Sequence, residues 1–127
     1  MNRHDTVGRI TSAIVVASLL LVAAGASAHA FLQRADPREG STVRAAPREV
    51  TLYFTERLEP AYSSARVIDE GGQPVDRGTS RVEPANPSVL RVSVLPLPPG
   101  AYKVIWRVLS VDSHITEGDF TFRVRAR

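Results

Sequence analysis

The stretch LPPGAYKVIWRVLSVDSHITEGDFTFRV, residues 97–124, decides the fold. Apolar side chains occupy every second position of its first part, at Tyr102, Val104, Trp106 and Val108. The same period of two returns near its end, at Phe120, Phe122 and Val124. This pattern indicates two half-buried strands, each with one apolar and one polar face. The polar segment 110–114 between them is therefore expected to form a hairpin-like connection at one end of a sheet structure.

Shorter strands are predicted in the rest of the chain. Alternating or β-branched segments lie at residues 50–55, 64–69, 79–82 and 90–94, and Gly-, Pro- or Asp-containing turns separate them. No segment after residue 28 shows a sustained period of 3.6. About seven short strands within one small domain predict an all-β fold. We expect an antiparallel Greek-key β-sandwich of immunoglobulin-like architecture.

The first 28 residues have the features of a secretory signal peptide. Arg3 and Arg9 precede an apolar run from Ile10 to Ala24, and Ala26-Ser27-Ala28 follows as a small-residue cleavage site. The run is shorter than the roughly 20 residues that span a bilayer, which argues against the alternative of an uncleaved membrane anchor. We therefore expect cleavage after Ala28 and a single domain at residues 29–127. Such a protein would be exported to a periplasm or to the extracellular cell envelope, with no membrane span.

Charge and cysteine content exclude several classes of site. The expected mature part keeps 14 of 16 basic and 12 of 13 acidic side chains, because Arg3, Arg9 and Asp5 are removed. Acidic and basic residues are interspersed, so no nucleic-acid partner is expected. The chain has no cysteine, which excludes thiolate sites for zinc, iron–sulfur clusters and blue copper.

Two histidines remain after the expected cleavage, His29 and His114. His29 would be the first residue, so its free amino group and its imidazole could chelate one metal ion together. Asp112 and His114 are two residues apart, and on extended backbone their side chains would point to the same side. Three nitrogens and one carboxylate oxygen suit Cu(II), which prefers tetragonal N,O coordination. We therefore predict one Cu(II) ion per chain.

Other interpretations of these residues remain open. Zinc accepts the same ligands, although structural zinc sites have four closed ligands that are often thiolates. Cu(I) would need soft sulfur donors, and the only methionine is Met1. Asp112 and His114 taken alone are also typical of a solvated turn. Glu56 could orient a ligand from outside the ligand set, and a solvated acid is the simpler interpretation of that residue.

The expected mature chain resembles CopC-type copper-binding proteins. The resemblance rests on His29 directly after the signal, on PREGSTVRAAPREVTLYFTERL (37–58), on DEGGQPV (69–75) and on the 97–124 block with its Ser-x-Asp-x-His segment. It implies a cupredoxin-like β-sandwich and a Cu(II) site at His29, Asp112 and His114, with Glu56 as an outer-sphere group. It also implies a monomer, and a membrane copper transporter of the CopD type as partner. The family commonly has Asp-Gly-His, and Ser113 replaces that glycine here.

Two function classes compete with a copper-binding module that has no reaction of its own. Lytic polysaccharide monooxygenases also bind copper through an N-terminal histidine and a second histidine. Asp112 as a ligand and the small size of the domain argue against such an enzyme. A structural or adhesive sandwich with accidental histidines is the other alternative. We therefore expect copper sequestration, homeostasis or transfer, without enzymatic activity.

Overall fold

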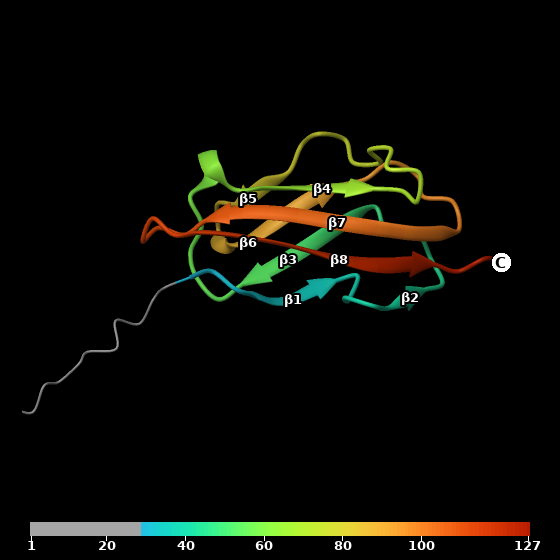
Figure 1. Ribbon diagram of the computed structural model, residues 1–127, viewed down its shortest axis with the longest axis horizontal. Coiled ribbons are helices and arrows are strands. Elements are labelled where there is room, and N and C mark those ends of the chain that lie inside the picture. Colours follow the sequence, from blue (N-terminus) through green and yellow to red (C-terminus); the bar gives the residue numbers. More distant parts are fainter. Residues whose placement is uncertain (1–28) are drawn as a thin grey trace, which may run out of the picture.

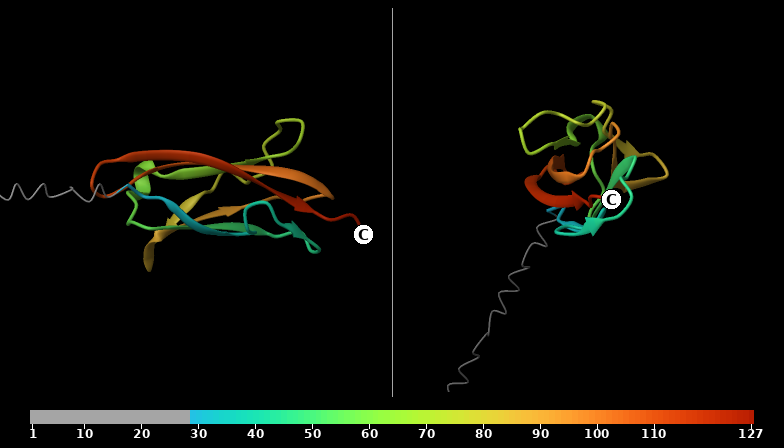
Figure 2. Two further views of the ribbon diagram at one scale, coloured as in Figure 1. Left: turned by 60° about the horizontal axis from the view of Figure 1, so that its bottom comes forward. Right: turned by 90° about the vertical axis from the view of Figure 1, so that its right-hand side faces the viewer.

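Eight strands form two four-stranded sheets in the computed structural model, which describes residues 29–127. The predicted signal sequence, residues 1–28, lies outside the described residues. One sheet contains, in spatial order, β1 (Leu32–Asp36), β3 (Glu49–Phe54), β6 (Asn86–Ser93) and β5 (Arg81–Glu83). The other contains β2 (Thr42–Val43), β8 (Ile115–Val124), β7 (Gly100–Leu109) and β4 (Ser64–Ile68). Figures 1 and 2 show the two layers face to face, which confirms the predicted all-β sandwich.

The hairpin of β7 and β8 is the longest pairing in the fold. Its register runs without interruption from Gly100↔Val124 to Leu109↔Ile115. Tyr102, Val104, Trp106 and Val108 of β7 are buried, whereas the alternate positions Lys103, Ile105 and Arg107 are exposed. The period-two pattern therefore fixes which face of each strand enters the core, as the sequence predicts.

Trp106 lies in the core between the two sheets. Its ring meets Phe54 of the opposite sheet edge-on, with ring centroids 5.1 Å apart and an interplanar angle of 74°. Gly118 is the cross-strand partner of Trp106. A Cβ atom on Gly118 would lie 2.5 Å from Trp106 Cζ2, so the glycine provides the space that the indole occupies.

Two strands were not predicted from the sequence. β1 is a half-exposed edge strand, and β2 has only two residues, so neither shows a clear alternation. Backbone pairing holds them, and β2 runs parallel to β8 with the register Thr42↔Arg123. This short parallel pair makes the second sheet mixed, whereas the other named strand pairs within residues 29–127 are antiparallel, as predicted.

A charged network covers part of the outer face of the first sheet. Glu49 accepts hydrogen bonds from Arg91 at 2.9 Å and from Arg81 at 3.0 Å, and Arg91 also binds Glu83 at 2.7 Å. Burial alone would raise the pKa of Glu49, but the bonds from Arg91 and Arg81 outweigh it and lower that pKa below its ordinary value of 4.5. Glu49 is therefore stabilised in its charged form by folding.

The pairing of β1 with β3 determines at which end of the sandwich His29 lies. Leu32 pairs with Phe54, so His29 lies beyond the end of β3, at the end of the sandwich that carries the β7–β8 connection. The C-terminus lies at the opposite end (Figure 1). Within residues 29–127, no helix is long and apolar enough to cross a membrane.

Candidate metal centre

The fold brings His29 and His114 together from distant parts of the sequence. Their ring centroids are 4.5 Å apart, with an interplanar angle of 51°. Two imidazoles that bind one ion through bonds of about 2.0 Å have ring centres about 4.4 Å apart when the bonds are at a right angle, and about 6.2 Å apart when they are opposite. The observed separation lies within this range. The two rings are thus close enough to share one metal ion.

Both sheets hold the backbone next to His29. Thr116 Oγ1 on β8 donates to the carbonyl of Ala30 at 2.6 Å, and Ala30 is fully buried. Thr55, just after β3, accepts from the amide of Phe31 at 3.0 Å and donates from the same hydroxyl to the His29 carbonyl at 3.4 Å. These two threonines form a clamp that fixes the backbone on both sides of Ala30. The position of His29 is therefore set by the sandwich.

A tight turn carries His114. Ser110 is fully buried; its hydroxyl accepts from the His114 amide at 3.3 Å, and its own amide donates to the His114 carbonyl at 3.0 Å. The amide of Ser113 donates to the Ser110 carbonyl at 2.9 Å, which closes the turn. The amide of Val111 donates to the Arg57 carbonyl at 3.0 Å and ties the turn to the segment after β3. His114 is thus presented by a connection whose base is rigid.

Ser113 has φ +67°, a left-handed conformation that favours glycine. It is the only residue other than glycine with positive φ among the described residues. Ser113, where the resemblance leads us to expect glycine, therefore has a glycine-like backbone conformation.

Asp112 is not arranged as the sequence argument assumed. Residues 111–113 form a turn, so the alternation rule for extended backbone does not apply to Asp112 and His114. In the part of the chain that the structure describes, no group of three His, Cys, Asp or Glu side chains is arranged to hold a metal ion. The structure therefore brings His29 and His114 together and leaves Asp112 exposed in the turn before His114.

Glu56 follows Thr55 at the same end of the sandwich and is partly buried. No hydrogen bond or ion pair found among residues 29–127 joins it to either histidine. Its predicted outer-sphere role remains a prediction.

The histidine pair is open to solvent. His114 is exposed and His29 is partly exposed. The ring of Phe31 lies 6.0 Å from that of His29 and is 60% exposed, and the hairpin residues Ile115 and Val111 are 53% and 46% exposed. A metal ion bound here could be exchanged with a second molecule without unfolding of the sandwich.

Sequence reasoning missed Thr55, Thr116 and Ser110. Thr116 occupies the inward face of β8, opposite the buried Val108. A hydroxyl at an inward position needs a hydrogen-bond partner. A polar residue on the inward face of this strand indicates a buried hydrogen bond, although its partner could not be identified from the sequence.

Comparison with known proteins identifies relatives over most of the chain. The family model described as "CopC domain" matches residues 32–125. "Copper resistance protein C" of Escherichia coli is 34% identical over 124 residues, which cover 91% of this chain and 98% of that protein. The crystal structure of CopC from Methylosinus trichosporium OB3b superposes with a TM-score of 0.68 and 38% identity, covering 76% of this chain and 93% of that one.

A longer protein also matches. "Copper transport protein CutJ" of Bacillus subtilis is 28% identical over 98 residues, which are 76% of this chain but only 18% of that protein.

Proposed function

The chain belongs to the CopC family, and from that premise we propose that it is an exported, monomeric protein that binds one Cu(II) ion through His29, Asp112 and His114. The relatives named for copper resistance and copper transport support a copper-related function and give no support to the monooxygenase alternative. The observation that carries the proposal is the 4.5 Å separation of the His29 and His114 rings.

Processing would add the third nitrogen. In the full chain the backbone nitrogen of His29 belongs to the peptide bond with Ala28. Cleavage after Ala28 would turn it into an amine within reach of a metal held by the same residue's imidazole. The clamp on Ala30 would keep this new terminus in place beside His114. A rotation of the exposed Asp112 side chain would then supply the carboxylate oxygen, with Glu56 acting on the site from outside the ligand set.

The donor set favours the cupric state. Imidazole, amine and carboxylate are the ligands of Cu(II), whereas Cu(I) is selected by thioether and thiolate sulfur. Residues 29–127 contain neither methionine nor cysteine. A single Cu(II) site, with no Cu(I) site, follows from these ligands.

We further propose that the bound copper is passed to a membrane copper transporter of the CopD type. A segment similar to this chain forms 18% of a protein named for copper transport. That arrangement supports a functional link between a sandwich of this kind and a transport step. The exposed apolar residues around the histidines offer a surface on which a second protein could take over the ion.

The decisive experiment compares correctly processed protein with variants of each ligand. We expect a Cu(II) titration to give one equivalent, and electron paramagnetic resonance to show a tetragonal nitrogen-rich spectrum. His29→Ala, His114→Ala, or one extra residue before His29 should each weaken binding at least tenfold and change the spectrum. Unchanged affinity after the addition of one residue would refute the amine ligand.

Asp112 needs a separate, matched test. Asp112→Asn should weaken Cu(II) binding, whereas Asp119→Asn, an exposed aspartate on β8, should leave it unchanged. Equal affinities for the two variants would remove Asp112 from the ligand set and leave the histidine ligands intact.

A further inference from the structure

We propose that the end of the sandwich opposite the histidines is a docking surface for anionic lipid headgroups. We call it the basic end and define it by six arginines: Arg44, Arg48, Arg77, Arg123, Arg125 and Arg127. All six are exposed. None of them forms an ion pair with a carboxylate among residues 29–127.

The topology concentrates these arginines. β2 and β8 end side by side, with the register Val43↔Val124 and a bond from the Arg125 amide to the Val43 carbonyl at 2.8 Å. The next residue, Arg44, therefore lies next to Arg125. Arg44, Arg125 and Arg127 line one shallow hollow. Three guanidinium groups around one depression, none of them ion-paired in the described residues, form an electrostatic site for anions.

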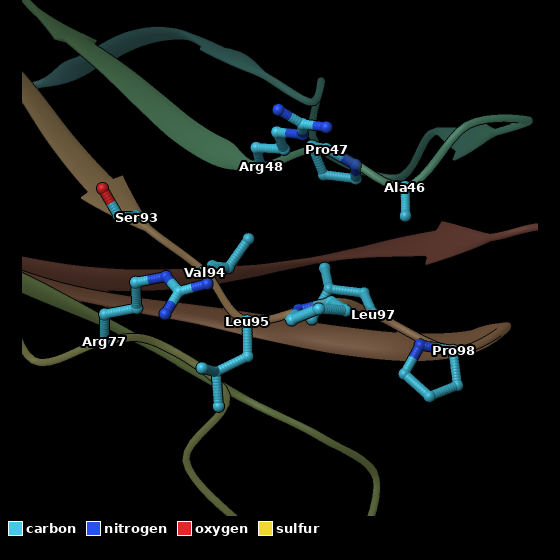
Figure 3. Close-up of a pocket in the computed structure, with 10 residues that line it drawn as sticks. Ala46, Pro47, Arg48, Arg77, Ser93, Val94, Leu95, Leu97 and Pro98 are labelled. Atoms are coloured by element: carbon cyan, nitrogen blue, oxygen red, sulfur yellow. The ribbon is translucent and has the colours of Figure 1, made fainter.

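A second depression adjoins the first through the loop of residues 44–48. It is lined by Arg48, Arg77 and the segment Val94–Pro98, and Figure 3 shows Leu95 beside Arg77 and pointing away from Arg48. Leu95 is 40% exposed here. An exposed leucine beside arginines suits the interface of a bilayer, where apolar groups reach past the headgroups while guanidinium groups bind phosphates.

Few acidic residues lie near this end, and none of them is ion-paired with one of the six arginines in the described residues. Asp69 accepts from the amides of Gly71 and Gln73, each at 2.9 Å, and Glu70 accepts from the amide of Ala101 at 3.3 Å. Glu39 is exposed in the turn before β2. These carboxylates do not neutralise six arginines.

An anionic bilayer fits this surface better than an acidic protein does. Protein interfaces have buried centres that are enriched in aromatic residues. The exposed aromatic residues of this chain, Phe31 and Tyr62, lie at the histidine end. The basic end offers arginines, prolines and one leucine on open, shallow loops, which suits a broad array of headgroups.

Docking by the basic end would orient the molecule. β7 has ten residues, so the sandwich extends about 30 Å along its strands. The histidine end would then face the aqueous compartment, where it can take up copper. Because the contact is electrostatic, it is reversible and salt-sensitive, and release would free the protein for transfer to a partner.

The test measures binding of the processed protein to vesicles of phosphatidylglycerol and phosphatidylcholine, and to vesicles of phosphatidylcholine alone. We expect binding to the anionic vesicles only, and its loss at about 0.5 M salt. Each arginine near an anionic surface contributes about fivefold in affinity. The triple variant Arg44→Gln, Arg125→Gln, Arg127→Gln should therefore bind about 100-fold more weakly.

The matched control removes the same charge elsewhere, as Arg34→Gln, Arg66→Gln and Arg107→Gln, at exposed positions outside the basic end. It should stay within about fivefold of the unchanged protein, and both triples should keep the native circular dichroism and Cu(II) affinity. Equal losses in the two triples would show an effect of net charge alone and overturn the proposal. Absence of binding at low salt, or binding to polyaspartate without binding to vesicles, would also overturn it. Because Cu(II) affinity is a separate readout, this failure is distinguishable from failure of the copper site.

Discussion

The Thr116 hydroxyl holds the backbone next to His29, and deleting this hydroxyl should weaken copper binding although Thr116 is not a ligand. Thr116→Val keeps the branched shape and deletes the donor to the Ala30 carbonyl, a bond of 2.6 Å. Ala30 is fully buried, so that carbonyl would lose its partner without gaining water. Leaving a buried acceptor unsatisfied costs about 1–3 kcal/mol.

The segment that loses this hydrogen bond, residues 29–31, is only marginally stable in its ordered position. Ordering residues 29–31 costs about 1–2 kcal/mol for each residue, which is similar to what a few hydrogen bonds and one buried methyl group supply. The variant should therefore release the segment in a large fraction of molecules. Apparent affinity falls in proportion to the competent fraction, and 1.4 kcal/mol corresponds to a factor of ten. We expect Cu(II) binding to weaken by about 5- to 100-fold.

A competition titration with a chelator of known affinity measures this loss. Thr116→Ser restores the hydroxyl and should recover most of the affinity, and Thr121→Val, at an exposed position of the same strand, should have no effect. At saturating copper the paramagnetic resonance spectrum of Thr116→Val should match that of the unchanged protein, because the donor atoms are the same. Wild-type affinity in Thr116→Val, or an equal loss in Thr116→Ser, would refute the clamp.

Three further substitutions test the fold around the site. Ser113→Gly removes the strain of a left-handed backbone conformation, about 1–2 kcal/mol, and this favours folding. It also increases the conformational entropy of the unfolded chain, which opposes folding by about 0.5–1 kcal/mol. The melting temperature should therefore rise by a few degrees, and a lower melting temperature would contradict this. Gly118→Ala places a methyl group 2.5 Å from the Trp106 ring and should cost about 1–3 kcal/mol with altered tryptophan fluorescence; unchanged melting and fluorescence would show that the ring can move freely. Because folding lowers the pKa of Glu49, this residue stabilises the folded state above pH 4.5, and the stabilisation is lost as the pH falls through the folded-state pKa. Glu49→Gln should therefore reduce the loss of unfolding free energy on the acid side by less than about 1 kcal/mol. An unchanged slope of unfolding free energy against pH would exclude this contribution.

The sequence predicts the fold wherever packing dictates the pattern. Alternation in residues 102–108 and 120–124 identifies the central hairpin, because each inward side chain must be apolar. β1 and β2 escape prediction, because an edge strand held by backbone bonds needs no such alternation. Tertiary pairing alone determines them.

The site divides in the same way. The expected cleavage point singles out His29 and the hairpin connection singles out His114, but only the family resemblance implies that they meet; the structure brings the two rings together. The direction of Asp112 could not be predicted, because it depends on the left-handed turn at Ser113. Local spacing predicts side-chain direction only on regular backbone.

The two histidine rings can meet before the signal peptide is removed, and this affects when the chain can bind copper tightly. The His29 and His114 rings lie together in the full chain, in which the nitrogen of His29 is still part of a peptide bond. The imidazole pair therefore does not depend on cleavage, whereas the amine does. Under the proposed function, an unprocessed chain would hold copper weakly through two rings, and cleavage would complete the chelate. High affinity would then arise only where signal peptidase acts, outside the cytoplasm, and that restriction would keep the precursor from competing for copper inside the cell.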